Sequence, residues 1–316
     1  MQREEFYYDS RDGVSKIHAI RWTPDPGTEP IAILQVIHGM QEYVGRYEDF
    51  AQYMTDRGFV VMGEDHLGHG LSIGEDGTAG YFCEVDPATV VVRDVHRLKK
   101  LTQEMYPGLP IYILGHSMGS FILRNYMYRY GTGIQGAIVM GTGQPPKAAV
   151  SAGALMAATQ SKIMGPKSIG KKLAAMSFAG YFKRIPDKKT DLDWLSVNEE
   201  NVQKYIADPL CGQPFTANGY VTLFELVRRM EEQENVDKVP KKLHVLFVAG
   251  GDDPVGSYGE GVNEAAGELK KAQVEDVTVK LYPGDRHEIL NEDDKETVKS
   301  DIYEWVKARI EADAAK

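Results

Sequence analysis

The sequence predicts an α/β fold in which a mostly parallel sheet of eight strands is flanked by helices. Strand-like and helix-like segments alternate over most of the chain, several of the strands are continuous apolar runs, and one long helical stretch interrupts the alternation. Apolar runs without an in-out pattern are typical of strands buried on both faces, as in a parallel sheet. Alternation of the two element types implies right-handed crossovers between neighbouring parallel strands.

The expected strands are short and rich in β-branched or apolar residues. The first two are joined by the turn-like Ser10-Arg11-Asp12-Gly13 and should form an antiparallel edge of the sheet. The expected strands are 4–8, 16–23, 31–37, 59–63, 111–115, 137–141, 243–250 and 277–282. Apolar residues at helical spacing predict helices at 45–57, 87–106, 117–130, 219–234, 257–271 and 294–311.

Residues 144–215 break this alternation, because they contain helical patterns and no convincing strand. The segment VSAGALMAATQSKIM is apolar and rich in alanine, and IGKKLAAMSFAGYF is amphipathic. A loop of this length without secondary structure would be improbable in a compact domain. We therefore expect a core made of 1–143 and 216–316, with 144–215 inserted as a helical cap, or lid, over the sheet.

Composition and charge exclude some classes of function. Hydrophobic residues make up 42% of the chain and charged residues 26%, which is ordinary for a globular protein with a packed core. The net charge is -10 and no run of Lys and Arg stands out. Nucleic acids and anionic lipid head groups both attract clustered positive charge. We expect no nucleic-acid partner and no simple electrostatic docking to anionic membranes.

The cysteines and the apolar runs bear on location. Cys83 and Cys211 lie far apart and lack metal-ligand spacing, so free thiols in a reducing compartment are expected. The first residues carry no apolar stretch of the kind found in signal peptides. No charge-free run approaches the ~20 residues that span a bilayer. These features predict a soluble cytoplasmic protein with no transmembrane segment, and they specify no oligomeric state.

The strongest local signal is the pentapeptide Gly115-His116-Ser117-Met118-Gly119. It lies between an expected buried strand and an expected helix, where the chain must turn sharply. Glycines on both sides of Ser117 remove the Cβ atoms that would clash in such a turn. The serine hydroxyl then stands at the carboxyl end of the sheet, where ligands bind in open α/β folds. We identify Ser117 as a candidate nucleophile rather than an ordinary helix N-cap.

A serine nucleophile needs a base and an acid that orients the base. His287 is the best placed of the eight histidines, because it lies in a loop directly after the last expected strand. His116 adjoins the serine but occupies the turn itself, so its side chain cannot also act as the base. Asp252 and Asp253 both follow the strand at 243–250 and are both candidates for the acid. The chain order Ser, Asp, His is the one expected for a nucleophile on a strand-to-helix turn.

The tetrahedral oxyanion needs two N–H donors. One should be the amide of Met118, the residue after the nucleophile and the first of a helix. The other should come from the loop after strand 31–37, with the amide of Met40 as the best candidate.

Four segments, taken together, resemble one known family. HGMQEYVGRYEDFAQYMTDRGFVVMGEDHLGHGLS, LGHSMGS, GGDDPVGSYGEGV and YPGDRHEILNE are similar to the monoacylglycerol lipase and lysophospholipase (serine aminopeptidase-like) branch of the α/β-hydrolases. The resemblance runs from about Ile31 to the C-terminus and is weakest in the expected cap. It implies the α/β-hydrolase fold, and it implies that the acid is Asp253, the residue before Pro254.

The same resemblance suggests residues of a substrate pocket. Glu42, Arg46 and Tyr47 are in register with the family's His-Gly-x-x-Glu-His-x-x-Arg-Tyr stretch, whereas Tyr43 stands where a histidine is usual. Glu42 and Arg46 are therefore expected to bind the polar part of the substrate. Apolar residues of the cap are expected to line a tunnel for an acyl chain. The residues proposed for this tunnel are Met156, Met164, Met176 and Phe178.

Two other motifs are set aside. The run Gly131 to Gly136 matches G-x-G-x-x-G, but it follows a helix and precedes a strand, the reverse of a dinucleotide site. Asp65, His66 and His69 lack a further ligand at zinc-like spacing. We expect neither a cofactor nor a metal.

The sequence thus predicts a serine hydrolase that cleaves carboxylic esters of lipid-like substrates, such as a monoacylglycerol or a lysophospholipid, through an acyl-enzyme. A short-chain carboxylesterase, a thioesterase or a peptidase would use the same triad. A non-catalytic binding protein of the same fold is disfavoured, because a binder gains nothing from keeping Ser117, Asp253 and His287. A haloalkane dehalogenase would need a carboxylate in place of Ser117.

Overall fold

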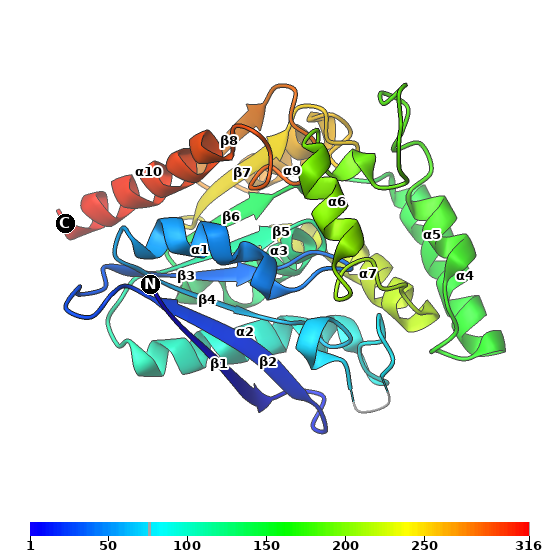
Figure 1. Ribbon diagram of the computed structural model, residues 1–316, viewed down its shortest axis with the longest axis horizontal. Helices are drawn as coiled ribbons and strands as arrows, with labels where there is room; N and C mark the ends of the chain where they lie inside the picture. Colours follow the sequence, from blue (N-terminus) through cyan, green and yellow to red (C-terminus); the bar gives the residue numbers. More distant parts are fainter. Residues whose placement is uncertain (75–76, 316) are drawn as a thin grey trace.

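A computed structural model describes residues 1–74 and 77–315 (Figure 1). Within these residues the chain forms one eight-stranded sheet in the order β1-β2-β4-β3-β5-β6-β7-β8. The strands are β1 (Gln2–Asp9), β2 (Lys16–Thr23), β3 (Ala32–Ile37), β4 (Phe59–Glu64), β5 (Ile111–His116), β6 (Gly136–Met140), β7 (His244–Gly250) and β8 (Asp276–Tyr282). β1 and β2 form an antiparallel edge, and β3 to β8 pair in parallel. The predicted α/β sheet is confirmed.

Helices cover both faces of the sheet, and α4, α5 and α6 gather at the end toward which the parallel strands point (Figure 1). The helices are α1 (Glu48–Thr55), α2 (Pro87–Met105), α3 (Met118–Tyr130), α4 (Lys147–Met164), α5 (Lys171–Ser177), α6 (Glu199–Ala207), α7 (Ala217–Met230), α8 (Gln233–Val236), α9 (Glu260–Lys271) and α10 (Lys295–Ala314). Short 3-10 turns lie at η1 (Val44–Tyr47), η2 (Gly70–Ser72), η3 (Gly131–Gly133) and η4 (Asp193–Leu195).

The sheet divides the core into two apolar layers. All six residues of β3 are buried, and successive side chains point to opposite faces. Ile33 and Ile37 pack in the layer under α2, α3 and α9, whereas Leu34 and Val36 pack in the layer under α1 and α10. Burial on both faces explains why the central strands are continuous apolar runs.

The segment between β6 and α7 differs from the rest of the chain. It contains α4, α5 and α6, and its one strand-like contact among the described residues is an isolated bridge from Ile169 to Thr216. Helix α5 ends at Ser177 and the chain then turns irregularly until η4, so the amphipathic pattern through 182 overstates the helix. Gly180 has a φ of 89°, which a right-handed helix does not allow.

The end of this segment is marked by a helix cap. The side chain of Thr216 accepts a hydrogen bond from the backbone N–H of Gly219 at 3.1 Å and starts α7.

None of the helices in the described chain is both long and apolar enough to cross a membrane.

Candidate active site

Ser117 lies in the tight turn between β5 and α3, with φ 54° and ψ -123°. A positive φ is strained for a residue that has a Cβ atom. The turn is held because the Ser117 N–H donates to the carbonyl oxygen of Met140 on β6, at 3.0 Å. A Cβ atom at Gly115 would lie 2.4 Å from the carbonyl oxygen of Gly119, and one at Gly119 would lie 2.1 Å from that of Ile37. Only glycine fits at these two positions.

His287 and Asp253 form a buried pair at the carboxyl ends of β8 and β7. Nδ1 of His287 is 2.9 Å from Oδ2 of Asp253, and both residues are buried. The other carboxylate oxygen of Asp253 accepts the N–H of Val255 at 2.8 Å. Asp252 is exposed and contacts the next loop only through its backbone N–H, which donates to Asp285. Of the two aspartates left open by the loop sequence, the structure brings Asp253 to the histidine.

A cavity of about 510 Å³ joins the predicted reactive residues. It is lined by Ser117, His287, Met40 and Met118 from the sheet and its loops and by Phe178 from residues 144–215, the expected cap (the cap segment). Nε2 of His287 is buried and has no hydrogen-bond partner among the described residues. This nitrogen is therefore available to take a proton from a group in the cavity.

The two predicted oxyanion donors lie at this cavity. In the described part of the chain, neither the Met40 nor the Met118 amide donates a hydrogen bond to another protein group. On one side of Met40, Gly39 donates its N–H to Glu42 Oε1 at 2.6 Å, which holds the loop in place. On the other side, the backbone of Gln41 has a positive φ of 61°. Amides that are held in place but left unpaired are suited to bind a developing negative charge.

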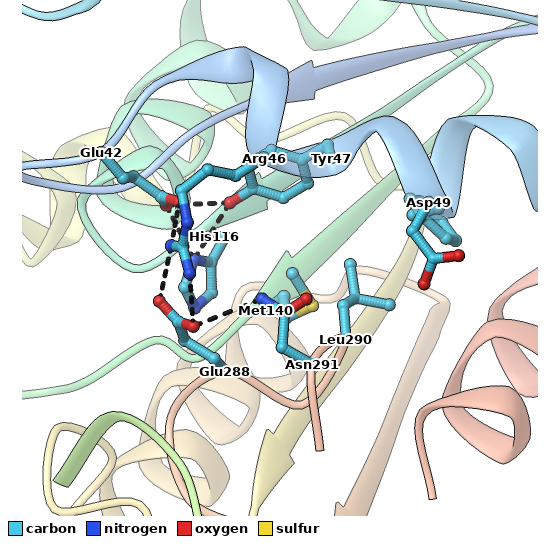
Figure 2. A pocket seen from close by; sticks show the side chains of 10 residues that line it. Glu42, Arg46, Tyr47, Asp49, His116, Met140, Glu288, Leu290 and Asn291 are labelled. Atoms are coloured by element: carbon cyan, nitrogen blue, oxygen red, sulfur yellow. Dashed lines mark hydrogen bonds and ion pairs between the residues drawn. The ribbon is translucent and has the colours of Figure 1, made fainter. Parts of the chain in front are cut away.

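A cluster of charged side chains adjoins the cavity, which Glu42, His116 and Glu288 help to line, and Figure 2 shows how these side chains face one another. The Arg46 guanidinium donates two hydrogen bonds to Glu288, at 2.6 and 2.7 Å, and one to Glu42, at 2.9 Å. Glu42 also accepts from the Tyr47 hydroxyl at 2.9 Å, and its carboxylate lies 3.1 Å from Nδ1 of His116. Burial would raise the pKa of Glu42, but the hydrogen bond from His116 and the Arg46 charge hold it well below its usual range.

This arrangement corrects the role expected for Arg46. Glu42 lines the cavity, but Arg46 does not, since its guanidinium is turned to the two carboxylates. The guanidinium stabilises two buried negative charges. Sequence reasoning missed Glu288, although it follows His287 directly, because its partner Arg46 lies 242 positions away.

The structure also corrects two of the four tunnel residues. Phe178 lines the cavity that Ser117 lines, and Met176 lines an adjoining apolar cavity of about 260 Å³. Met156 and Met164 line neither, and 42% and 68% of their surfaces are exposed. The buried residues of α4 are Val150, Gly153 and Ala157, so the helix turns its small side chains inward and its methionines outward.

Two aromatic residues of the cap segment were not predicted. The Trp194 ring lies 5.2 Å from the His287 ring between centroids, and Tyr181 lines both cavities. The stretch that holds Trp194 is tied to the His287 loop, because Glu288 donates its N–H to Leu195 at 2.7 Å and Arg286 donates to the carbonyl oxygen of Asp193 at 2.6 Å.

The histidines set aside as metal ligands are packed together. The His66 ring lies 4.0 Å from that of His38 between centroids, and His69 packs against Phe82. Among the described residues, no three His, Cys, Asp or Glu side chains are grouped so that they could hold a metal ion.

Comparison with known proteins identifies the family of this chain. The sequence model of the family described as serine aminopeptidase, S33, matches residues 28–294. The chain belongs to this family. The monoglyceride lipase of Homo sapiens is 31% identical over 297 residues, which are 91% of this chain and 86% of that one. The monoacylglycerol lipase of Mycolicibacterium smegmatis is 28% identical over 98% of each chain.

Among solved structures, a thermostable carboxyl esterase from Bacillus coagulans, in complex with glycerol, superposes with a TM-score of 0.91. It is 30% identical and the match covers 98% of this chain and 99% of that one. Membership of the S33 family and these relatives confirm the expected α/β-hydrolase fold and the expected class of enzyme, a carboxylic-ester hydrolase.

Proposed function

We propose that this chain is a serine hydrolase that cleaves the ester bond of monoacylglycerols, or of closely related single-chain lipid esters, through Ser117, His287 and Asp253. One observation carries the proposal. The Asp253–His287 pair, the strained Ser117 and the unpaired amides of Met40 and Met118 surround one cavity. This is the set of groups that acyl transfer through a serine ester requires.

Each residue has a defined part in the reaction. Ser117 Oγ attacks the ester carbonyl carbon while His287 Nε2 takes its proton. Asp253 accepts the Nδ1–H of His287, which keeps Nε2 free as the base and stabilises the imidazolium. The carbonyl oxygen becomes negatively charged and receives hydrogen bonds from the amides of Met40 and Met118. His287 returns its proton to the alcohol oxygen, the C–O bond breaks, and an acyl-enzyme remains. Water then attacks the acyl carbon while His287 takes one of its protons. The bond from Ser117 Oγ to the acyl carbon breaks, His287 returns the proton to Oγ, and the fatty acid leaves.

The cavities support a substrate with an acyl chain. Apolar residues from both the core and the cap segment line the larger cavity, and it shares Phe121, Tyr181, Leu223 and Val255 with the smaller one. Each methylene transferred from water into such a space contributes about 0.8 kcal/mol. The human and mycobacterial relatives named above are lipases of monoacylglycerols. Both facts favour a lipid ester over an acetate.

Two further expectations belong to this proposal. Residues 144–215 would act as the cap that closes the acyl site over a core of 1–143 and 216–316, since Phe178 and Trp194 from that segment lie at the cavity and at His287. A cytoplasmic location is supported by Cys83 and Cys211, which are both buried free thiols.

The proposal is tested by hydrolysis of p-nitrophenyl esters of graded chain length, measured beside glycerol monoesters. We expect kcat/KM to rise from acetyl to medium-chain esters and the glycerol monoesters to be cleaved. The likeness to the Bacillus coagulans carboxyl esterase favours a second candidate, a carboxylesterase for short chains. A kcat/KM that is highest for acetate and falls with length would favour this second candidate and contradict the first.

A further inference from the structure

His116, which precedes the nucleophile, has acceptor atoms at both ring nitrogens. Nε2 lies 3.2 Å from the backbone carbonyl oxygen of His287, an atom that can only accept. Nδ1 lies 3.1 Å from Oε1 of Glu42. The residue is 4% exposed. A neutral imidazole carries one N–H, whereas an imidazolium carries two.

Among the described residues, the alternative donor to Nδ1 is already engaged. The Tyr47 hydroxyl is 3.1 Å from Nδ1, but it lies closer, at 2.9 Å, to the carboxylate of Glu42. A hydroxyl has one proton to give, and a carboxylate is the stronger acceptor. With Nδ1 unprotonated, its lone pair would face the lone pairs of Glu42 in a buried site.

The charges around His116 also favour a ring that is protonated at both nitrogens. The titratable or charged groups of the described residues that face His116 or its partners are Glu42, Arg46, Tyr47, Glu288 and His287. The His287 ring lies 4.7 Å from the His116 ring between centroids, and the His287 carbonyl oxygen accepts from Nε2. With a neutral His116 this buried group would hold two negative charges and one positive charge. A buried, uncompensated charge is costly. Burial alone lowers the pKa of His116, but the hydrogen bond to Glu42 outweighs it and the pKa is raised.

His116 also joins the two loops that supply the reactive groups. Through Glu42, which accepts the Gly39 N–H, it contacts the loop that carries Met40. Through the His287 carbonyl oxygen it contacts the loop that carries the base. The geometry points to His116 as a positioning residue: a doubly protonated imidazolium that holds the oxyanion loop and the base loop in register under Ser117. This inference rests on the reaction proposed above.

The charge of His116 is measurable without any catalysis. Long-range ¹H–¹⁵N NMR of the protein labelled with ¹⁵N at histidine should show both assigned ring nitrogens of His116 protonated at about pH 8, where a histidine with the ordinary pKa of about 6.5 is almost entirely neutral. In Glu42→Gln, which removes the negative partner, the ring should be neutral at the same pH. A neutral His116 ring in the wild type would overturn the inference.

The positioning role is measured by kinetics. His116→Gln keeps one amide donor and loses the charge and the second N–H. We expect kcat for a p-nitrophenyl ester of fixed length to fall roughly 10- to 100-fold, the effect of a small misplacement of reacting groups, with KM changed less than about two-fold. Labelling of Ser117 by a fluorophosphonate should slow by the same factor. The matched control is His96→Gln on α2, whose ring stacks on Tyr130 away from the cavity. It should retain kcat within about two-fold.

The outcomes separate this inference from the proposed reaction. A His116→Gln enzyme with the wild-type kcat would overturn the inference and leave the reaction intact. A wild type that cleaves no ester would overturn the reaction, and the NMR measurement would still report the charge of His116. If His116→Gln does not fold, the wild-type and Glu42→Gln spectra decide the protonation state.

Discussion

The two walls of the cavity, one formed by the core and one by the cap segment, differ in the contacts that their side chains make. The wall formed by the core is held by short hydrogen bonds: behind it Arg46 donates three to two buried carboxylates, and Asp253 accepts two. The wall formed by the cap segment is mostly apolar and aromatic, with Ser177 and Asp191 as its polar members and with Phe178, Tyr181 and Trp194 packed ring against ring.

The difference assigns separate tasks to the two walls. Reaction geometry must be held within fractions of an ångström, and charge-assisted hydrogen bonds in a buried site provide that constraint. An acyl chain is bound by apolar contacts, which have no preferred direction. Aromatic and aliphatic side chains provide such contacts. Substitutions in the core wall should therefore lower turnover, and substitutions in the cap wall should change preference among substrates.

The largest effect is expected at the nucleophile. Ser117→Ala should lower kcat for a p-nitrophenyl ester by a factor on the order of 10⁶, because no acyl-enzyme can form. The fold should survive, since the hydroxyl is at the cavity rather than in the packed core. Labelling by a fluorophosphonate followed by peptide mapping checks the site. A label found on another residue, or turnover retained by the alanine variant, would contradict the assignment.

The two aspartates give a matched pair in the core wall. Asp253→Asn should lower kcat by a factor on the order of 10⁴, because the amide favours the wrong tautomer of His287. Asp252→Asn should change kcat less than about three-fold, since the exposed side chain of Asp252 is not part of the buried pair. Equal losses in the two variants would show that the buried geometry does not identify the acid.

In the cap wall, Phe178 and Met164 form the corresponding pair. Phe178→Ala should lower kcat/KM for medium-chain esters about ten-fold and leave acetate nearly unchanged, because the lost contact is with the acyl chain. Met164→Ala should leave the whole chain-length series within about two-fold of the wild type, because Met164 is 68% exposed and lines neither cavity. If Phe178→Ala slows all esters equally, the cap wall also serves the chemistry and the contrast between the walls fails.

The smallest effect on catalysis is expected at Glu64, a buried carboxyl that sharpens the contrast with Glu42. Burial raises the pKa of Glu64 to about 8, and its hydrogen bond comes from the neutral hydroxyl of Tyr8. The folded protein therefore holds a proton that the unfolded chain releases near the ordinary glutamate pKa of 4.5. This contribution to the free energy of unfolding is present at acidic pH and is lost as pH rises from there to about 8.

Glu64→Gln should reduce this loss, which is on the order of a few kcal/mol, and leave kcat unchanged. Urea unfolding of the wild type and the variant at several pH values within this window measures it. Parallel curves for the two proteins would contradict the role of Glu64.

Much of this molecule follows from local sequence, and the exceptions have a common cause. The strands, the turn at Ser117 and the loops after β7 and β8 are set by apolar runs, glycines and element order within a few residues. Which face of α4 is buried depends on its partner α7, and Gly153 approaches Phe224 on that helix so closely that a Cβ atom would lie 2.4 Å from the ring. Arg46 and Glu288 form an ion pair although they lie 242 positions apart. No pattern in the sequence around either residue predicts this pair.

The pairing of Arg46 with Glu288 has a consequence for recombining this chain with its relatives. A crossover placed anywhere between the two residues takes one from each parent, although they must neutralise each other in a buried site. A chimera whose second parent lacks an acidic residue at the position of Glu288 would bury a guanidinium with one carboxylate in place of two. Exchanging residues 42–46 together with the loop that carries Glu288 should restore folding to such chimeras without any change at the crossover itself.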